Sequence, residues 1–328
     1  MFPYLFTRIP IRSVDRPRDD VKRASTRRSP AVRDVRSATF WGRAPLATLG
    51  ARPTKQAGAG SMALLRERHL NASTIGATGN AAAALRLLTG LEADCRTRLG
   101  DDAWFTLVVR HGVAYWTGVC GRAPRARQQT QDLLDVYRER LDDRDHRALR
   151  LLRDDLARWT GETGDARDAA LQYTGLHRDT ERILGPEASE TLLTRHNTAY
   201  WTAAHGARAQ ALAECRALLD DEHRVNGPAH PHTLAVRHNI AGWTEAEGEP
   251  RDSLSLFTTL LEDRTAALGH EHPHTLLNAF HVGRLTRHHR NASAGDTRLV
   301  ELLPLFTRVL GGGHPWTRRL HRELRAGQ

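Results

Sequence analysis

The sequence predicts an all-α solenoid of antiparallel helix pairs, because three residue ladders recur with a period of 42 or 43 residues. A tryptophan, a glycine five residues after it, and a leucine or asparagine repeat in phase along the chain. Self-similarity at a period of roughly 20–50 residues is typical of repeat proteins, whose units bury their apolar faces against their neighbours. The ladders are Trp116, Trp159, Trp201 and Trp243; Gly121, Gly164, Gly206 and Gly248; and Leu99, Leu141, Leu184, Asn226, Leu268 and Leu310.

Each repeat reads as two helices. In the repeat at 226–267, Pro231 stands where the first residue of a helix tolerates a missing N–H, and Pro273 and Pro315 recur at that place. We expect the first helix to end at Gly248, where a left-handed residue is needed. The second helix carries apolar side chains three, three and one residues apart on one face, namely Leu254, Phe257, Leu260 and Leu261.

Six such repeats are expected over residues 57–309, and residues 310–328 are expected to form a C-terminal capping helix. The first repeat, before Leu99, is the weakest match. The sixth has Leu285 in place of the tryptophan and Arg290 in place of the glycine. Arginine-rich faces on the last segment suit a helix that closes the solenoid toward water.

Residues 1–56 share none of this pattern and carry most of the positive charge. The chain has a net charge of +10, and this segment holds eleven Arg and two Lys against four Asp, which accounts for +9. Arg, Pro and Ser are scattered there without a helical or strand period, which predicts a disordered tail. Three interpretations are open: the tail makes weak contact with anions or nucleic acid, it has no function, or it is an over-extended gene start and translation begins at Met62.

Cysteine usage and hydropathy favour a cytoplasmic protein. Cys95, Cys120 and Cys215 form no CxxC pair, which indicates a reducing compartment. No apolar stretch approaches the ~20 residues of a membrane-spanning helix. Nearly all of the 48 basic residues are arginine, a bias typical of high-GC bacterial genomes.

The repeat resembles a known family in its details. Residues 226–243 read NGPAHPHTLAVRHNIAGW, with a G-P-x-H-P-x-T-L opening, an R-H-N-x-A core and a W-T step. These features resemble the 42-residue tetratricopeptide repeats of kinesin light chains and of many actinobacterial proteins. The resemblance covers about residues 57–325 and is strongest over 184–275. It implies a right-handed superhelix of antiparallel helix pairs that binds peptides on its concave side.

The resemblance also assigns the peptide-contacting positions to the first helix of each repeat. The family's groove asparagines match Asn197 and Asn239 only, while Gly112, Asp155 and His281 stand at the equivalent positions. An amide both donates and accepts hydrogen bonds, so it can pair with a peptide backbone or hold neighbouring helices together. Both roles are open from the sequence. The predicted peptide-binding residues are His196, Asn197, Tyr200, His238, Asn239, Tyr115 and Arg158.

Two ladders allow a packing role or a binding role. The tryptophans could stack bases or sugars, but beside Ala and Leu at helical spacing we favour packing between repeats. An arginine ladder near the starts of the first helices could bind anions, but we favour ion pairs with neighbouring acidic residues. Its members are Arg68, Arg110, Arg153, Arg195 and Arg237.

Metal and catalytic signals are weak. His270, His272 and His274 alternate within GHEHPHT and could bind zinc or nickel. A similar GPAHPHT at 227–233 assigns the His-Pro step to the turn between repeats instead. The imidazoles of His232 and His274 are expected near the positive end of a helix, which disfavours their protonation. No P-loop, HExxH, GxSxG or nucleotide fingerprint occurs, so we expect no metal, no cofactor and no enzymatic activity.

These observations predict a non-catalytic scaffold for protein–protein interaction. It would bind a peptide or a partner's helix in the concave groove of the solenoid. The alternative is a sensor or regulatory module of a signalling or transcription regulator, with nucleic-acid contact through the basic tail. The sequence does not indicate the partner or the oligomeric state.

Overall fold

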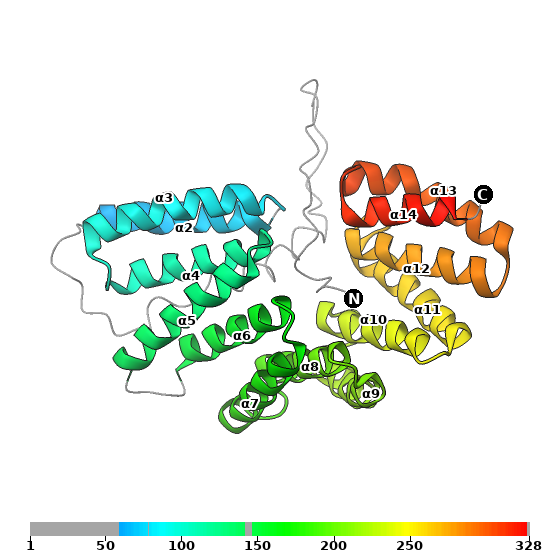
Figure 1. Ribbon diagram of the computed structural model, residues 1–328, viewed down its shortest axis with the longest axis horizontal. Coiled ribbons are helices and arrows are strands. Elements are labelled where there is room, and N and C mark those ends of the chain that lie inside the picture. The colour runs from blue at the N-terminus through cyan, green and yellow to red at the C-terminus, as the bar shows by residue number, and fades with distance from the viewer. Residues whose placement is uncertain (1–58, 78, 142–145, 327–328) are drawn as a thin grey trace, which may run out of the picture. The chain divides into compact units, whose positions relative to one another are not determined.

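The computed structural model describes residues 59–77, 79–141 and 146–326, and every regular element in these ranges is an α-helix (Figure 1). The predicted basic tail, residues 1–56, lies outside them, so nucleic-acid contact through it stays a prediction. The described residues divide into two compact units between Asp135 and Val136, inside one helix. We call 59–135 the N-terminal unit and 136–326 the C-terminal unit, and describe each by itself.

The N-terminal unit contains α2 (Ala59–Ala77), α3 (Ala81–Leu99), α4 (Trp104–Val119) and most of α5 (Ala123–Arg140). Helix α3 packs against both α2 and α4 (Figure 1). The core between them is almost wholly apolar and includes Leu88, Leu91, Cys95, Phe105 and Val109. Burial of these side chains is the main force that holds the three helices together.

The C-terminal unit contains nine described helices, each packed against the next in the chain. The even-numbered helices are the first helices of their repeats, and the odd-numbered ones are the second helices. Two pairs of these even-numbered helices also contact each other directly, α8 with α10 and α12 with α14. The helices are α6 (Arg147–Glu162), α7 (Ala166–Leu184), α8 (Ser189–Ala204), α9 (Arg208–Val225), α10 (Pro231–Ala246), α11 (Pro250–Leu268), α12 (Pro273–His289), α13 (Ala292–Val309) and α14 (Pro315–Arg325).

The turns follow the predicted chemistry, with one addition. Pro231, Pro273 and Pro315 each begin a helix. Gly248 follows α10 with a φ of 95°, the left-handed conformation that favours glycine. Each of these prolines is preceded by a histidine whose Nδ1 accepts a hydrogen bond from the N–H two residues later. Histidine therefore caps these helices, a role that the sequence pattern does not reveal.

The tryptophan ladder packs between repeats, which confirms the interpretation favoured from the sequence. Trp201 is 5% exposed and its ring covers Gly161 of the preceding first helix, where an added Cβ would lie 2.2 Å from the ring. Trp116 covers Gly76 at the same distance in the N-terminal unit. A residue without a side chain is therefore needed under each of these two indoles, because the packed interior has no spare volume.

The arginine ladder forms ion pairs within repeats, as favoured from the sequence. Four arginines of first helices pair with an aspartate 26 residues later, on the second helix of the same repeat, at 2.6–2.7 Å. Arg110 pairs with Glu92 at 3.9 Å instead. The four regular pairs are Arg68–Asp94, Arg153–Asp179, Arg195–Asp221 and Arg237–Asp263.

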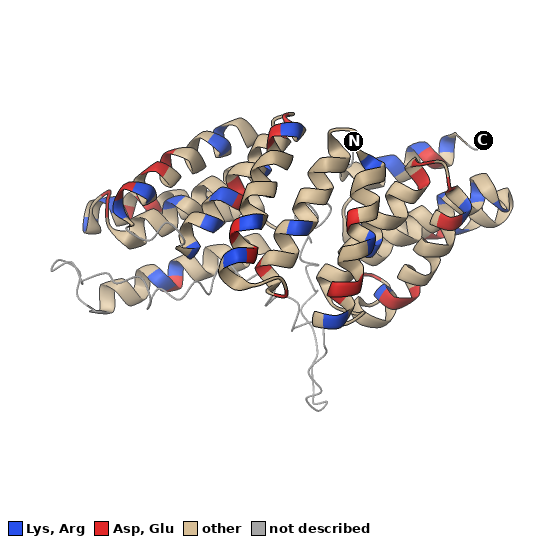
Figure 2. Cartoon of the chain, turned by 90° about the horizontal axis from the view of Figure 1, so that it is seen from below, with Lys and Arg blue, Asp and Glu red and all other residues tan. Residues whose placement is uncertain are grey.

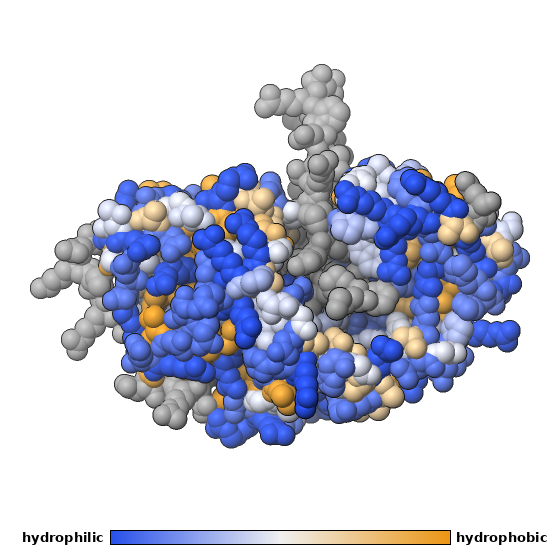
Figure 3. All heavy atoms as spheres, viewed as in Figure 1, coloured by the Kyte–Doolittle hydropathy of each residue, from blue (hydrophilic) through white to orange (hydrophobic). Residues whose placement is uncertain are grey.

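The described surface is polar and carries charges of both signs. Acidic and basic residues are interspersed over the helices in Figure 2, and the face in Figure 3 is mainly hydrophilic, with hydrophobic residues scattered over it. Among the described helices, none combines the length and apolar character that crossing a membrane requires.

Candidate functional site

The candidate site lies on the first helices of the C-terminal unit, at two consecutive positions that recur every 42 residues. Helices α6, α8, α10 and α12 supply both positions, so each residue has a counterpart in the next repeat. The first position holds Asp154, His196, His238 and Phe280, and the second holds Asp155, Asn197, Asn239 and His281.

Residues at these positions contact one another from repeat to repeat. The Asn197 side-chain amide donates a hydrogen bond to Asp154 Oδ1 at 3.2 Å, linking α8 to α6. The Asn239 amide lies 2.8 Å from His196 Nε2, linking α10 to α8 in the same way. Both predicted asparagines therefore connect neighbouring first helices. Because a primary amide offers two donor hydrogens and an acceptor oxygen, one such bond leaves capacity for another partner.

The residues of this network differ in exposure. Asn197 is 6% exposed, whereas His196, Tyr200 and Asn239 are half-buried. His238 is also 6% exposed, and its ring packs 5.3 Å from that of Phe257 on the second helix α11. His238 thus contributes to the interior between α10 and α11 as well as to the row of predicted site residues.

The carboxyl group of Asp154 has an unusual affinity for protons. Burial raises its pKa to about 7, and the adjacent Asp155 carboxylate adds to the rise. Arg158 and the hydrogen bond from Asn197 act in the opposite direction but do not cancel it. Near neutral pH this carboxyl group is therefore only partly ionised.

The imidazoles are neutral at physiological pH. Burial lowers the pKa of His196 to about 3 and that of His238 well below its usual range. Burial is also the main cause that lowers the pKa of His232 to about 4, with the neighbouring His230 second. The shift expected for His232 is thus found, but desolvation rather than the helix end dominates it.

The remaining predicted residues pack against the tryptophan ladder. Tyr200 meets Trp201 edge to face at 5.2 Å, and the Arg158 guanidinium lies 4.5 Å from the centre of the Trp159 ring. Tyr115 meets Trp116 edge to face at 5.1 Å, but on α4 of the N-terminal unit. The structure therefore brings six of the seven predicted residues into one unit and places Tyr115 in the other.

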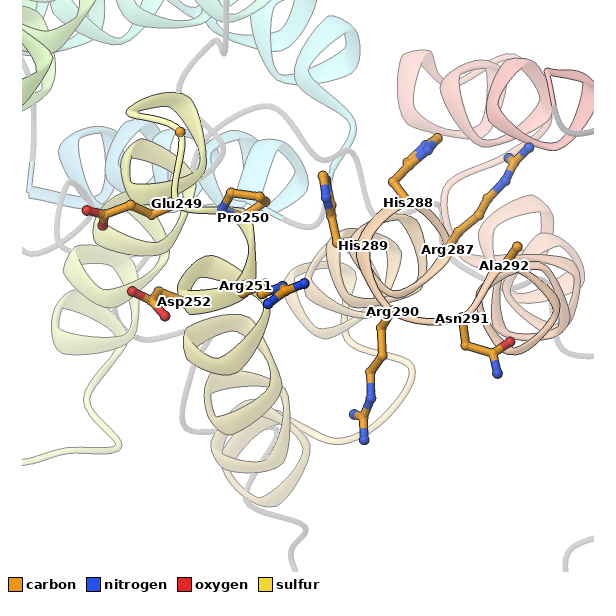
Figure 4. A pocket seen from close by; sticks show the side chains of 11 residues that line it. Glu249, Pro250, Arg251, Asp252, Arg287, His288, His289, Arg290, Asn291 and Ala292 are labelled. Atoms are coloured by element: carbon orange, nitrogen blue, oxygen red, sulfur yellow. The ribbon is translucent and has the colours of Figure 1, made fainter.

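A pocket of about 580 Å³ lies between the start of α11 and the end of α12 (Figure 4). Arg251 extends toward α12, whereas Glu249 and Asp252 extend to the other side. Arg287 and His288 contact Glu323 at 2.6 and 2.7 Å. Because these contacts already engage Arg287 and His288, and none of the predicted site residues lines the pocket, we do not assign a ligand to it.

The alternating histidines have a structural explanation. His272 caps α12 by accepting the His274 N–H at 3.2 Å. In the described part of the chain, no three His, Cys, Asp or Glu side chains come together as a metal site.

Comparison with known proteins supports the fold. No family model and no curated protein matches the chain, but solved structures of tetratricopeptide-like repeat proteins do. A putative kinesin light chain from Podosopora anserina is 19% identical with a TM-score of 0.51, over 62% of this chain and 96% of that one. NprR in complex with its cognate peptide NprX is 8% identical with a TM-score of 0.57, over 81% and 71%. A Rap protein complexed with Competence and Sporulation Factor is 10% identical with a TM-score of 0.55, over 81% and 76%. Identities this low establish a shared fold alone.

Proposed function

We propose that this tetratricopeptide-like repeat protein binds an extended peptide segment along the first helices α8 and α10 of its C-terminal unit. It would act as an interaction scaffold without catalysis, in the cytoplasm, where its three free cysteines stay reduced. The solved structures of NprR with its peptide and of Rap with its factor support a binding role for this fold.

The observation that carries the proposal is the hydrogen bond between Asn239 and His196. It joins two adjacent first helices through half-buried polar groups at one level. A purely structural contact could be made by apolar side chains, as it is between the other faces of these helices. Polar groups kept at a half-buried helix junction are suited to pair with an incoming backbone.

The spacing of the helices suits an extended ligand. Packed helices lie about 8–10 Å apart, and an extended chain advances about 3.3–3.6 Å per residue. Asn197 and Asn239 would therefore meet backbone groups about three residues apart. Such amide contacts read the backbone and leave the choice of side chains to the surrounding surface.

The chemistry of that surface favours uncharged ligand side chains opposite α8 and α10. His196 is neutral, because burial lowers its pKa, and the ring of Tyr200 is half-buried beside Trp201. Arg195 and Asp221 pair with each other at 2.7 Å. A ligand held here would gain most from backbone hydrogen bonds and from contact with the tyrosine ring.

A phage-displayed random peptide library, selected on the full chain, supplies the probe. Replacing Asn239 with Ala should weaken binding of the selected peptides about tenfold, because it leaves a backbone group of the ligand without its partner. Gln210→Ala, an exposed amide on the second helix α9, is the matched control and should leave affinity unchanged. Equal affinity of the wild type and Asn239→Ala would refute this site.

A further inference from the structure

The interface between the fifth and sixth repeats, formed by α10, α11 and α12, contains ionisable side chains where apolar ones would be expected. His238, Arg264 and His281 are 6%, 2% and 2% exposed. Phe257 and Asn278, which are fully buried, lie beside them: the Phe257 ring contacts both histidine rings, and the Asn278 amide donates to the Phe257 carbonyl oxygen. Burying groups that can carry charge costs free energy unless they are neutral or paired.

The two imidazoles form one aromatic cluster. The His281 ring stacks on Phe257 at 4.6 Å with an interplanar angle of 13°. It meets the His238 ring edge to face at 5.5 Å and the Trp316 ring at 6.0 Å. His281 therefore joins α12 to α10, α11 and the closing helix α14. A charge on this ring would be placed among apolar neighbours.

Arg264 brings a permanent positive charge to the same interface. Its guanidinium donates to the carbonyl oxygens of Leu234 at 3.0 Å and His274 at 3.1 Å. Its Nη1 also lies 3.5 Å from His238 Nδ1. No carboxylate of the described residues forms an ion pair with Arg264. A proton on His238 would therefore face a cation at hydrogen-bonding distance.

Besides burial, the groups that lower the pKa values of His238 and His281 are arginines and, for His238, the other histidine of the cluster. After burial, Arg264 and His281 lower the pKa of His238, against a smaller rise from a hydrogen bond with Asn278, and Arg284, Arg319 and Arg264 lower the pKa of His281. His274 is influenced by Arg264, His272 and His238, and Arg264 by Arg237. Three acidic residues of the helices packed here are already engaged: Asp263 pairs with Arg237, Glu245 with Arg284, and Glu323 with Arg287 and His288.

We propose that this interface is an acid-sensitive joint, at which protonation of His238 and His281 releases α12, α13 and α14 from the rest of the C-terminal unit. The joint follows from the packing of these helices and does not depend on what the protein binds.

Lower pH should favour the opened interface, because the opened form binds protons more readily than the closed form. Burial and the surrounding cations hold the pKa of both histidines well below 6.5 in the closed form, while an exposed histidine has a pKa of about 6.5. The opened form therefore takes up protons that the closed form excludes. Closure is fully stable above about pH 6.5 and is lost progressively as the pH falls below it. Between pH 7 and pH 5, each histidine should raise the opening constant about 25-fold, and the pair about 600-fold.

Hydrogen–deuterium exchange on the full chain at both pH values, corrected for intrinsic exchange, tests the proposal. Protection of α12, α13 and α14 should fall at least about 600-fold from pH 7 to pH 5, because opening also frees His274, whose pKa is held well below its usual range by burial and by Arg264. The N-terminal unit should lose no more than about 25-fold, the share of His69, whose pKa burial lowers to about 4. An equal loss in both units would overturn the joint.

Two variants test the two histidines, and each introduces a residue that this chain carries at the equivalent position of another repeat. His281→Asn introduces the residue found at 197 and 239, and His238→Phe the residue found at 280. Each should make the pH effect about 25-fold smaller, while His289→Asn, exposed at the end of α12, should leave it unchanged. An undiminished pH effect in both interface variants would refute the proposal.

If a variant does not fold at pH 7, NMR titration of the wild-type histidine rings provides the same test. The His238 and His281 rings should stay neutral until protection of α12 is lost. Protonation of either ring in the closed form would overturn the joint.

Discussion

Gly112 in the N-terminal unit and Asn239 in the C-terminal unit occupy the same place in their repeats, yet their surroundings are opposite. A Cβ on Gly112 would lie 3.1 Å from Leu88 Cδ1, so an apolar side chain already fills the space beside it. Asn239 instead holds His196 of the preceding repeat. The repeat period thus determines where a residue lies, while its neighbours determine whether that position can bind anything.

One buried position of the second helices likewise keeps its place in every repeat while its residue type changes. It recurs four residues before each leucine or asparagine of the ladder and is 0–3% exposed in all six repeats. Its occupants are chemically unrelated: Cys95, Tyr137, Thr180, Glu222, Arg264 and Phe306. The fold therefore buries this position in each repeat, whereas the type of side chain differs from repeat to repeat. In the N-terminal unit the position holds the apolar Cys95, whereas in the C-terminal unit it holds Glu222 and Arg264 as well as the apolar Phe306.

The largest expected effect is on packing that both units share. Trp201→Ala should lower the free energy of unfolding by about 3–5 kcal/mol, because the indole that covers Gly161 leaves a cavity. Trp116→Ala tests the same contact in the N-terminal unit, where the tryptophan is less buried, and should cost less. Urea unfolding measures both. A loss below 1 kcal/mol for Trp201→Ala would contradict the packing.

The second-largest expected effect, a loss of stability at equivalent buried positions, should differ between the two units. Arg264→Ala should cost about 2–5 kcal/mol, since it leaves a cavity and two carbonyl groups without their donor. Cys95→Ala, at the equivalent apolar position, should cost about 1–2 kcal/mol. Chemical denaturation of the two variants gives the ratio. Equal losses of unfolding free energy would mean that the hydrogen bonds of buried Arg264 add nothing to stability beyond the packing found at the equivalent apolar position.

The sequence predicted the regular features of this fold well, because each is local or periodic. Pro231 at a helix start and Gly248 at a helix end depend on single backbone positions. The ion pairs of the arginine ladder could be predicted because the acidic partners stand at a fixed separation within one repeat. The division of the described chain after Asp135 has no counterpart in the repeat pattern.

The candidate site could be predicted only in part from the sequence. The resemblance pointed to Asn197 and Asn239, but their partners lie 43 residues away on neighbouring helices. The cluster of His238, Arg264 and His281 was missed because its members come from three helices. Which side chains meet across helices depends on how the repeats stack, and a one-dimensional pattern does not contain that information. Whether the asparagines bind a ligand remains a prediction.

A smaller effect concerns the asparagines themselves. Asn197→Ala and Asn239→Ala should each lower the free energy of unfolding by about 0.5–1.5 kcal/mol, the net value of one hydrogen bond. Thermal denaturation measures this loss separately from peptide affinity. A stability loss of several kcal/mol with unchanged affinity would make the asparagines purely structural.

The smallest effect is expected at the ion pairs. Arg237→Gln breaks the 2.6 Å pair with Asp263, whose side chain is 45% exposed, so the loss should stay below about 1 kcal/mol. The difference between variant and wild type should shrink further at 1 M salt, because salt screens exposed charges. Urea midpoints at low and high salt check this, and a salt-independent loss would point to packing of the arginine stem instead.

Site-specific photo-crosslinking tests the central claim, peptide binding on the first helices of the C-terminal unit, most directly. Tyr200 and Tyr115 stand one residue before a ladder tryptophan and meet its ring at nearly the same distance, 5.2 and 5.1 Å. A photoreactive phenylalanine analogue at each position, mixed with a library-selected peptide, compares the two units under matched geometry. We predict crosslinking from position 200 that excess unlabelled peptide abolishes, and little from position 115. Crosslinking from position 115 alone would contradict the assignment of the site to α8 and α10.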